Sequence, residues 1–79
     1  MTNPLYDPYA VLFKVYSGGA YLKQALADTP VEEANRPRTT RICYGVLEND
    51  LYLERCVKTF AAKNPKLPVR ILLKIALYL

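Results

Sequence analysis

The sequence has no histidine and no tryptophan, and it contains only three glycines and two cysteines. The absence of histidine removes the side chain that most often acts as a general base or binds a metal ion. Two cysteines cannot complete a four-ligand zinc site, and three glycines are too few for a glycine-rich phosphate-binding loop. We therefore expect no enzyme active site, no metal site and no cofactor in this chain.

A long hydrophobic run is also missing. The most apolar segment, residues 67–79, is interrupted by Arg70 and Lys74 and is too short to cross a membrane. Residues 1–7 carry neither a basic start nor an apolar run, so we expect no secretory signal and a cytoplasmic protein. In that compartment Cys43 and Cys56 are expected to be reduced and packed as small hydrophobic side chains, with a disulfide or a reactive thiol as the alternative.

The charge is distributed unevenly over a chain of one-domain length. The 79 residues, which we treat as a single domain, carry a net charge of +4, and 52% of them are hydrophobic. Residues 1–35 hold two basic and four acidic side chains, whereas residues 36–79 hold nine basic and three acidic ones. A basic half of this kind predicts contact with nucleic acid, and a solvated surface is the alternative interpretation.

Prolines and glycines divide the chain into helical segments, expected over about residues 7–17, 20–28, 36–48, 50–63 and 69–79. No stretch alternates like a strand, so the class is all-α, a small orthogonal bundle of about five short helices. Thr29 and Glu32 have the spacing of a capping box, and Asp50 is placed to cap the fourth helix. Helical spacing predicts the inward residues Tyr9, Leu12, Phe13, Tyr16, Tyr21, Leu22, Ala25, Leu26, Ile42, Cys43, Val46, Leu47, Leu53, Val57, Phe60 and Ala61.

The last helix is apolar on every side except the strip that carries Arg70 and Lys74. Such a helix belongs in a core, yet no segment after Leu79 covers it, so we expect a truncated chain. Uncovered apolar side chains would favour self-association as a homodimer or swapped pair. The residues expected at that contact are Ile71, Leu72, Ile75 and Tyr78.

Two single residues predict contacts between helices. Gly45 lies inside the third helix, where glycine costs about 1 kcal/mol relative to alanine, so we expect another helix to cross closely there. We expect the guanidinium of Arg70 to pair with an acidic residue, with a phosphate contact as the alternative.

Three motifs resemble one known family. They are Arg41-Ile-Cys-Tyr-Gly-Val-Leu-Glu48, then Leu53-Glu54, then Leu67-Pro-Val-Arg-Ile-Leu-Leu-Lys-Ile-Ala-Leu-Tyr-Leu79. Together they are similar to the NusB-type RNA-binding domain, and most closely to the N-terminal domain of Sun/Fmu-type 16S rRNA cytosine-5 methyltransferases. The resemblance covers roughly residues 9–79 and implies a bundle of about seven helices, so this chain would hold an incomplete NusB-like fold. It departs from the family pattern in the missing last helices, the non-basic N-terminus and Pro37.

The resemblance implies a non-catalytic RNA-binding module, the N-terminal rRNA-recognition domain of a tRNA or rRNA cytosine-C5 methyltransferase. The catalytic thiolate and the S-adenosylmethionine site would belong to the remainder of that methyltransferase chain. One alternative is a stand-alone NusB-type antitermination factor that binds RNA with a ribosomal protein. The other is a helical protein-interaction or self-association module. Tyr6 and Tyr52 could stack on bases, although ordinary half-burial is the simpler interpretation. The candidate RNA contacts are Arg36, Arg38, Arg41, Lys63, Lys66, Arg70 and Lys74.

Overall fold

A computed structural model describes residues 5–60 and 65–79 of the chain. Within these residues the protein is all-α, with no strand, as expected. The helices are α1 (Tyr6–Gly18), α2 (Leu22–Asp28), α3 (Arg36–Glu48), α4 (Asp50–Phe60) and α5 (Leu67–Tyr78), and a short 3-10 turn, η1 (Glu33–Asn35), precedes α3.

Local chemistry explains where the helices begin and end. Pro37 and Pro68 occupy the first turns of α3 and α5, where the missing N–H of proline needs no partner. Gly19 ends α1 in the left-handed conformation (φ 69°) that glycine adopts without strain. The prediction of a capping box at Thr29 was wrong. The Thr29 hydroxyl donates to the Ala25 carbonyl oxygen at 2.7 Å, at the C-terminal end of α2. Only the short turn η1 follows before α3.

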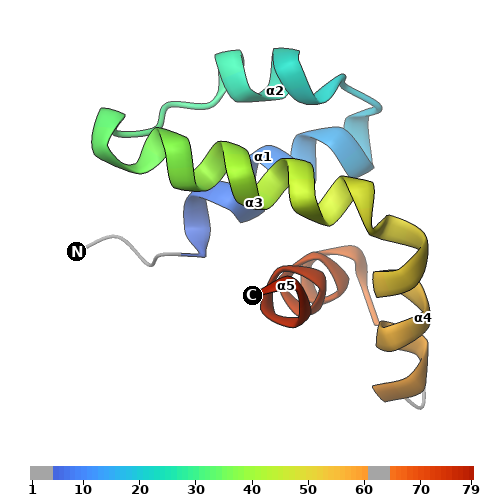
Figure 1. The fold of residues 1–79 in the computed structure, drawn as a ribbon. Coiled ribbons are helices and arrows are strands. Elements are labelled where there is room, and N and C mark those ends of the chain that lie inside the picture. The colour runs from blue at the N-terminus through green and yellow to red at the C-terminus, as the bar shows by residue number, and fades with distance from the viewer. Residues whose placement is uncertain (1–4, 61–64) are drawn as a thin grey trace.

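The helix α5 packs against three of the other four helices. It contacts α1, α3 and α4, while α1 also packs against α2 and α3. Figure 1 shows α5 nearly along its axis and α3 lying across the view, so the two helices cross steeply, as in an orthogonal bundle. The buried core residues are Val11, Leu12, Ala25, Ile42, Cys43, Val46, Leu53, Ile71 and Ile75.

These contacts bury part of the self-association face expected on the last helix, while self-association itself stays a prediction. Ile71 and Ile75 are fully buried, and Tyr78 packs half-buried against the core. Only Leu72 of that set is exposed, with 41% of its surface accessible. Ile71 and Ile75 were wrongly expected at such a contact, because they pack into the core that α5 forms with α1, α3 and α4. Other apolar side chains of α5 stay exposed, among them Val69 and Leu77.

Three aromatic residues expected in the core lie outside it. Tyr21 is 85% exposed because its extended backbone precedes α2 and leaves it off the apolar face of that helix. Phe60 is 75% exposed at the last position of α4, and Phe13 lies at the edge of α1 with its ring 5.9 Å from that of Tyr9. Ala61, the other expected core residue of that segment, lies outside the described residues.

The two cysteines are free thiols, as expected. Cys43 is buried on α3, where its thiol lies 3.8 Å from the carbonyl oxygen of Pro8, and burial raises its pKa to about 12. Cys56 is half-buried on α4. In the part of the chain that the structure describes, no cluster of potential ligands could hold a metal ion, and no helix is long and apolar enough to span a membrane.

Candidate nucleic-acid interface

Three of the expected RNA-binding arginines gather at the start of α3. Arg36 is the first residue of the helix, and Arg38 and Arg41 follow on its outer side, all with exposed side chains. Tyr44 continues the same side at three-residue spacing and is also exposed. The opposite side of α3 faces the core, so packing holds this surface outward. We call Arg36, Arg38, Arg41 and Tyr44 the α3 basic face.

The helix terminus reinforces the positive potential of the α3 basic face. The first turn of α3 contains no acidic residue, and no side chain of the described residues caps it. A helix N-terminus carries a partial positive charge, so cations there are unfavourable by roughly 0.3–1 kcal/mol each and anions are favourable. The arrangement therefore weakens the helix while it strengthens attraction for phosphate groups.

The other expected contacts do not join this face. Lys66 is exposed directly before α5, and Figure 1 shows that α3 and α5 begin on opposite sides of the molecule. Lys63 lies outside the described residues. The six candidates that the structure describes thus do not form one continuous patch, and the compact group among them is the set of arginines on α3.

Lys74 was wrongly expected to reach RNA. Only 3% of its surface is exposed. Its ammonium group contacts carboxylate oxygens of Asp50 at 2.8 Å and Glu54 at 2.7 Å, both on α4. Arg70 pairs with Glu54 at 3.6 Å, which agrees with the expected structural pairing. Both cations of α5 are therefore committed to carboxylates of α4.

Tyr16 of α1 completes this charge network. Its hydroxyl donates to Asp50, and the ammonium group of Lys74 lies 4.7 Å from the centre of its ring. Burial and the nearby Asp50 raise the pKa of Tyr16, so its hydroxyl keeps its proton. Hydrogen bonding to Lys74 lowers the pKa of Glu54. Burial acts to raise the pKa of Asp50, but the hydrogen bonds from Lys74 and Tyr16 prevail and lower it.

The network is a structural link between three helices. It joins α1, α4 and α5 through side chains whose charges largely cancel. None of its side chains is an exposed, activated nucleophile. Sequence reasoning did not identify Asp50 and Glu54 as its anions. A signal was present, since Asp50 and Glu54 are spaced i, i+4 on one helix and Arg70 and Lys74 are spaced i, i+4 on the next.

Comparisons with protein-family models, with curated proteins and with solved structures give no match for this chain. What bears on function is therefore the α3 basic face, together with the motifs that resemble the NusB-type domain.

Proposed function

We propose that this protein is a non-catalytic RNA-binding module that holds the RNA backbone through the α3 basic face. The observation that carries the proposal is the group of three exposed arginines at one end of α3, without an acidic residue in its first turn. Arginine side chains neutralise phosphates and release counterions, which supplies most of the affinity in backbone recognition. The helix N-terminus adds a favourable field for the same anions.

The composition of this face supports RNA rather than a purely solubilising role. Cations at a helix N-terminus are repelled by the partial positive charge of the helix dipole, so a purely solubilising role does not explain why the arginines lie there. Tyr44 lies beside Arg41 on the exposed side and offers an aromatic surface on which an unpaired base can stack. Backbone contacts from the arginines and stacking on Tyr44 together suit a single-stranded loop flanked by a helix.

The motif resemblance supports the larger context of the proposal. A module of the kind found at the N-terminus of rRNA cytosine-5 methyltransferases would position the substrate RNA, while a separate domain carries out methyl transfer. In that context the described helices need supply no catalytic group.

The proposal is tested with a charge-reversal pair and a matched control. Arg38→Glu with Arg41→Glu reverses two charges on the α3 basic face, and Arg55→Glu with Lys58→Glu makes the same change on exposed positions of α4. Fluorescence anisotropy with a labelled rRNA hairpin measures the affinity, and circular dichroism confirms that each variant is folded. We expect the α3 pair to weaken binding at least about tenfold and the α4 pair to weaken it less than about threefold.

Equal losses in the two variants would show that net charge alone attracts RNA. Unchanged affinity in a folded α3 variant would show that these arginines are only a solvated surface. Either result contradicts the proposal.

A further inference from the structure

The helix α4 lies at one edge of the molecule (Figure 1). Among the helices that the structure describes, it contacts only α5 and the preceding α3, and it buries two side chains, Leu53 and Val57. The helix α5, in contrast, also packs against α1 and α3, and it places Ile71 and Ile75 in the core. Without α4, α5 would therefore keep two of its three packing partners.

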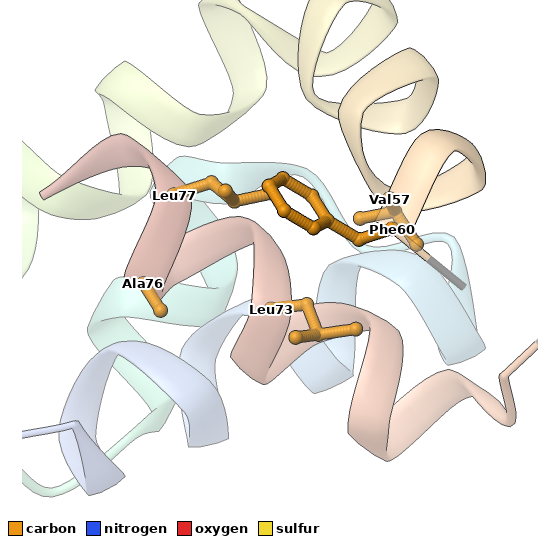
Figure 2. A pocket seen from close by; sticks show the side chains of 5 residues that line it. All are labelled: Val57, Phe60, Leu73, Ala76 and Leu77. Atoms are coloured by element: carbon orange, nitrogen blue, oxygen red, sulfur yellow. The ribbon is translucent and has the colours of Figure 1, made fainter.

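The last turn of α4 is only partly covered by α5. An open apolar groove of about 280 Å³ separates the two helices there, lined by Val57 and Phe60 of α4 and by Leu73, Ala76 and Leu77 of α5. Figure 2 shows the ring of Phe60 reaching across from α4 toward Leu77, yet 75% of Phe60 is exposed. Apolar surface that stays in contact with water adds little to stability, so this end of α4 is weakly held.

The first half of α4 is held to α5 by ion pairs. Lys74 of α5 is 3% exposed, and its ammonium nitrogen lies 2.8 Å from Asp50 and 2.7 Å from Glu54. Loss of one partner from a buried ion pair is strongly destabilising, because the remaining charge is left uncompensated away from water. The other charged or titratable groups that interact with Lys74 or with its two partners are Tyr16 of α1, Lys58 of α4 and Arg70 of α5.

From these contacts we propose that α4 is a flap that opens separately from the rest of the bundle, and that Lys74 holds it closed while Asp50 and Glu54 carry their charge. When both carboxylates are neutral, Lys74 is a buried cation without a counter-ion. Water reaches it most easily by displacement of α4, because α1 and α5 each pack against more elements than α4 does.

The length of α4 favours opening by local unfolding. The helix has 11 residues, and helices shorter than about 12–15 residues are marginal in water without tertiary contacts. Once α4 leaves α5, it therefore loses its own order, while α1, α3 and α5 remain packed against one another. The inference does not depend on RNA binding, since none of the residues that carry it belongs to the α3 basic face.

The test is amide hydrogen exchange, followed by NMR at several low urea concentrations. The amides of Leu53 and Val57 report on α4, and those of Leu12 and Val46 report on the core of α1 and α3. In the wild-type protein we expect the α4 amides to be at least about tenfold less protected than the core amides. Their exchange should also depend less on urea, because local opening exposes less surface than global unfolding.

Neutralising the two carboxylates tests the role of Lys74. Asp50→Asn with Glu54→Gln should lower the protection of the α4 amides at least about tenfold at neutral pH, and they should stay less protected than the core amides. Adding Lys74→Met removes the unpaired cation and should raise α4 protection again by at least about threefold. Substitution at neutral pH is cleaner than acid, which also protonates the exposed carboxylates.

The matched control is Asp28→Asn with Glu48→Gln, which removes the same charge from exposed positions of α2 and α3. It should change α4 protection less than about threefold. Circular dichroism confirms that each variant is folded. Glu54→Gln alone, which leaves Asp50 on Lys74, should lower α4 protection at least about threefold and keeps the test decisive if the double variant does not fold.

Four results would overturn the proposal. One is that the α4 and core amides exchange with equal protection and equal urea dependence, because α4 would then open only with the whole bundle. Another is unchanged α4 protection in the folded double variant. The third is an equal loss in the control variant, and the fourth is that Lys74→Met restores nothing, because the loss would then not come from an unpaired cation.

Discussion

The phenol ring of Tyr78 on α5 lies directly over Gly45 on α3, so closely that a Cβ atom on residue 45 would overlap the ring. This contact confirms the expectation that another helix crosses at Gly45. It also explains how a glycine is accommodated inside a helix, because the loss of helix propensity is offset by burial of an aromatic ring.

The contact predicts that the effect of Gly45→Ala depends on Tyr78. In the wild-type background, the added methyl group displaces the ring, and we expect the free energy of unfolding to fall by about 1 kcal/mol after the gain in propensity. In a Tyr78→Ala background the same substitution should raise the free energy of unfolding by about 1 kcal/mol. Urea denaturation of the four proteins measures both values.

Gly18→Ala provides the control for this reversal. Gly18 is the last residue of α1, and no neighbouring side chain lies within 4 Å of the place that an added Cβ atom would take, so no ring is displaced. Its effect should be the same in the wild-type and Tyr78→Ala backgrounds. If Gly45→Ala raised the free energy of unfolding in both backgrounds, the ring of Tyr78 would have to move aside at no cost in stability, which would contradict the prediction.

The charge network predicts a loss of stability in acid that depends on Lys74. The pKa values of Asp50 and Glu54 are lowered on folding. Their contribution is therefore fully present above the unfolded-state pKa values of about 4, and it is lost as the pH falls through the lower folded-state values. Lys74→Met should reduce the free energy of unfolding by about 1–3 kcal/mol at neutral pH and by clearly less in acid. Urea midpoints at neutral pH and in acid, below the ordinary carboxyl pKa, measure the difference.

Lys66→Met is the matched control for the acid experiment. It removes the same charge beside the same helix from an exposed position and should leave the acid dependence unchanged. If Lys74→Met shows the same loss of stability at both pH values, its effect comes from packing and not from the carboxylates.

The two thiols should differ in reactivity toward a disulfide reagent. Only the thiolate attacks such a reagent, and burial raises the pKa of Cys43 to about 12. We expect Cys56 to react at least about a hundredfold faster than Cys43 in the folded protein at mildly alkaline pH. The single-cysteine variants Cys43→Ser and Cys56→Ser separate the two rates, and urea should remove the protection of Cys43. Rapid labelling of Cys43 in native conditions would show that the core opens around α3.

The proposed RNA contact predicts a change in salt dependence. The logarithm of the affinity falls linearly with the logarithm of the salt concentration, and each phosphate that a cation neutralises on single-stranded RNA makes this fall steeper by about 0.7. Replacing Arg38 and Arg41 by glutamine should lower that slope by about 1.4, and the affinity should fall for every RNA sequence tested. A loss of affinity with an unchanged slope would indicate that the two side chains act through something other than phosphates.

Helix positions could be predicted from the sequence because their signals are local. Pro37, Pro68 and Gly19 act on their own backbone, so the helices begin and end within a few residues of the expected places. The exposed aromatic residues show the limit of this reasoning. Helical spacing can assign Phe60 to an apolar side of α4, but the presence of a partner on that side depends on how α5 crosses it.

The residues of the candidate site also differ in whether local sequence signals could predict their positions. The outward position of Arg38 and Arg41 follows from the buried stripe of their own helix and could be predicted. The burial of Lys74 could not, because its partners Asp50 and Glu54 lie on a different helix, about 20 residues earlier in the sequence. A lysine on an apolar helix is indistinguishable from a solvated charge until the position of the opposing carboxylates is known.

The packing of α5 against three earlier helices has a consequence for how the protein is made. This helix contacts α1, α3 and α4, yet it is synthesised after all of them. At about 5–20 residues per second, the ribosome completes α1 through α4 roughly a second before α5 can emerge. During that interval the sides of α1 and α3 that later contact α5 have no partner from it, so the nascent helices present an open apolar surface. The contacts of α1, α3 and α4 with α5 can therefore form only after α5 has been synthesised, and until then that apolar surface is open to solvent.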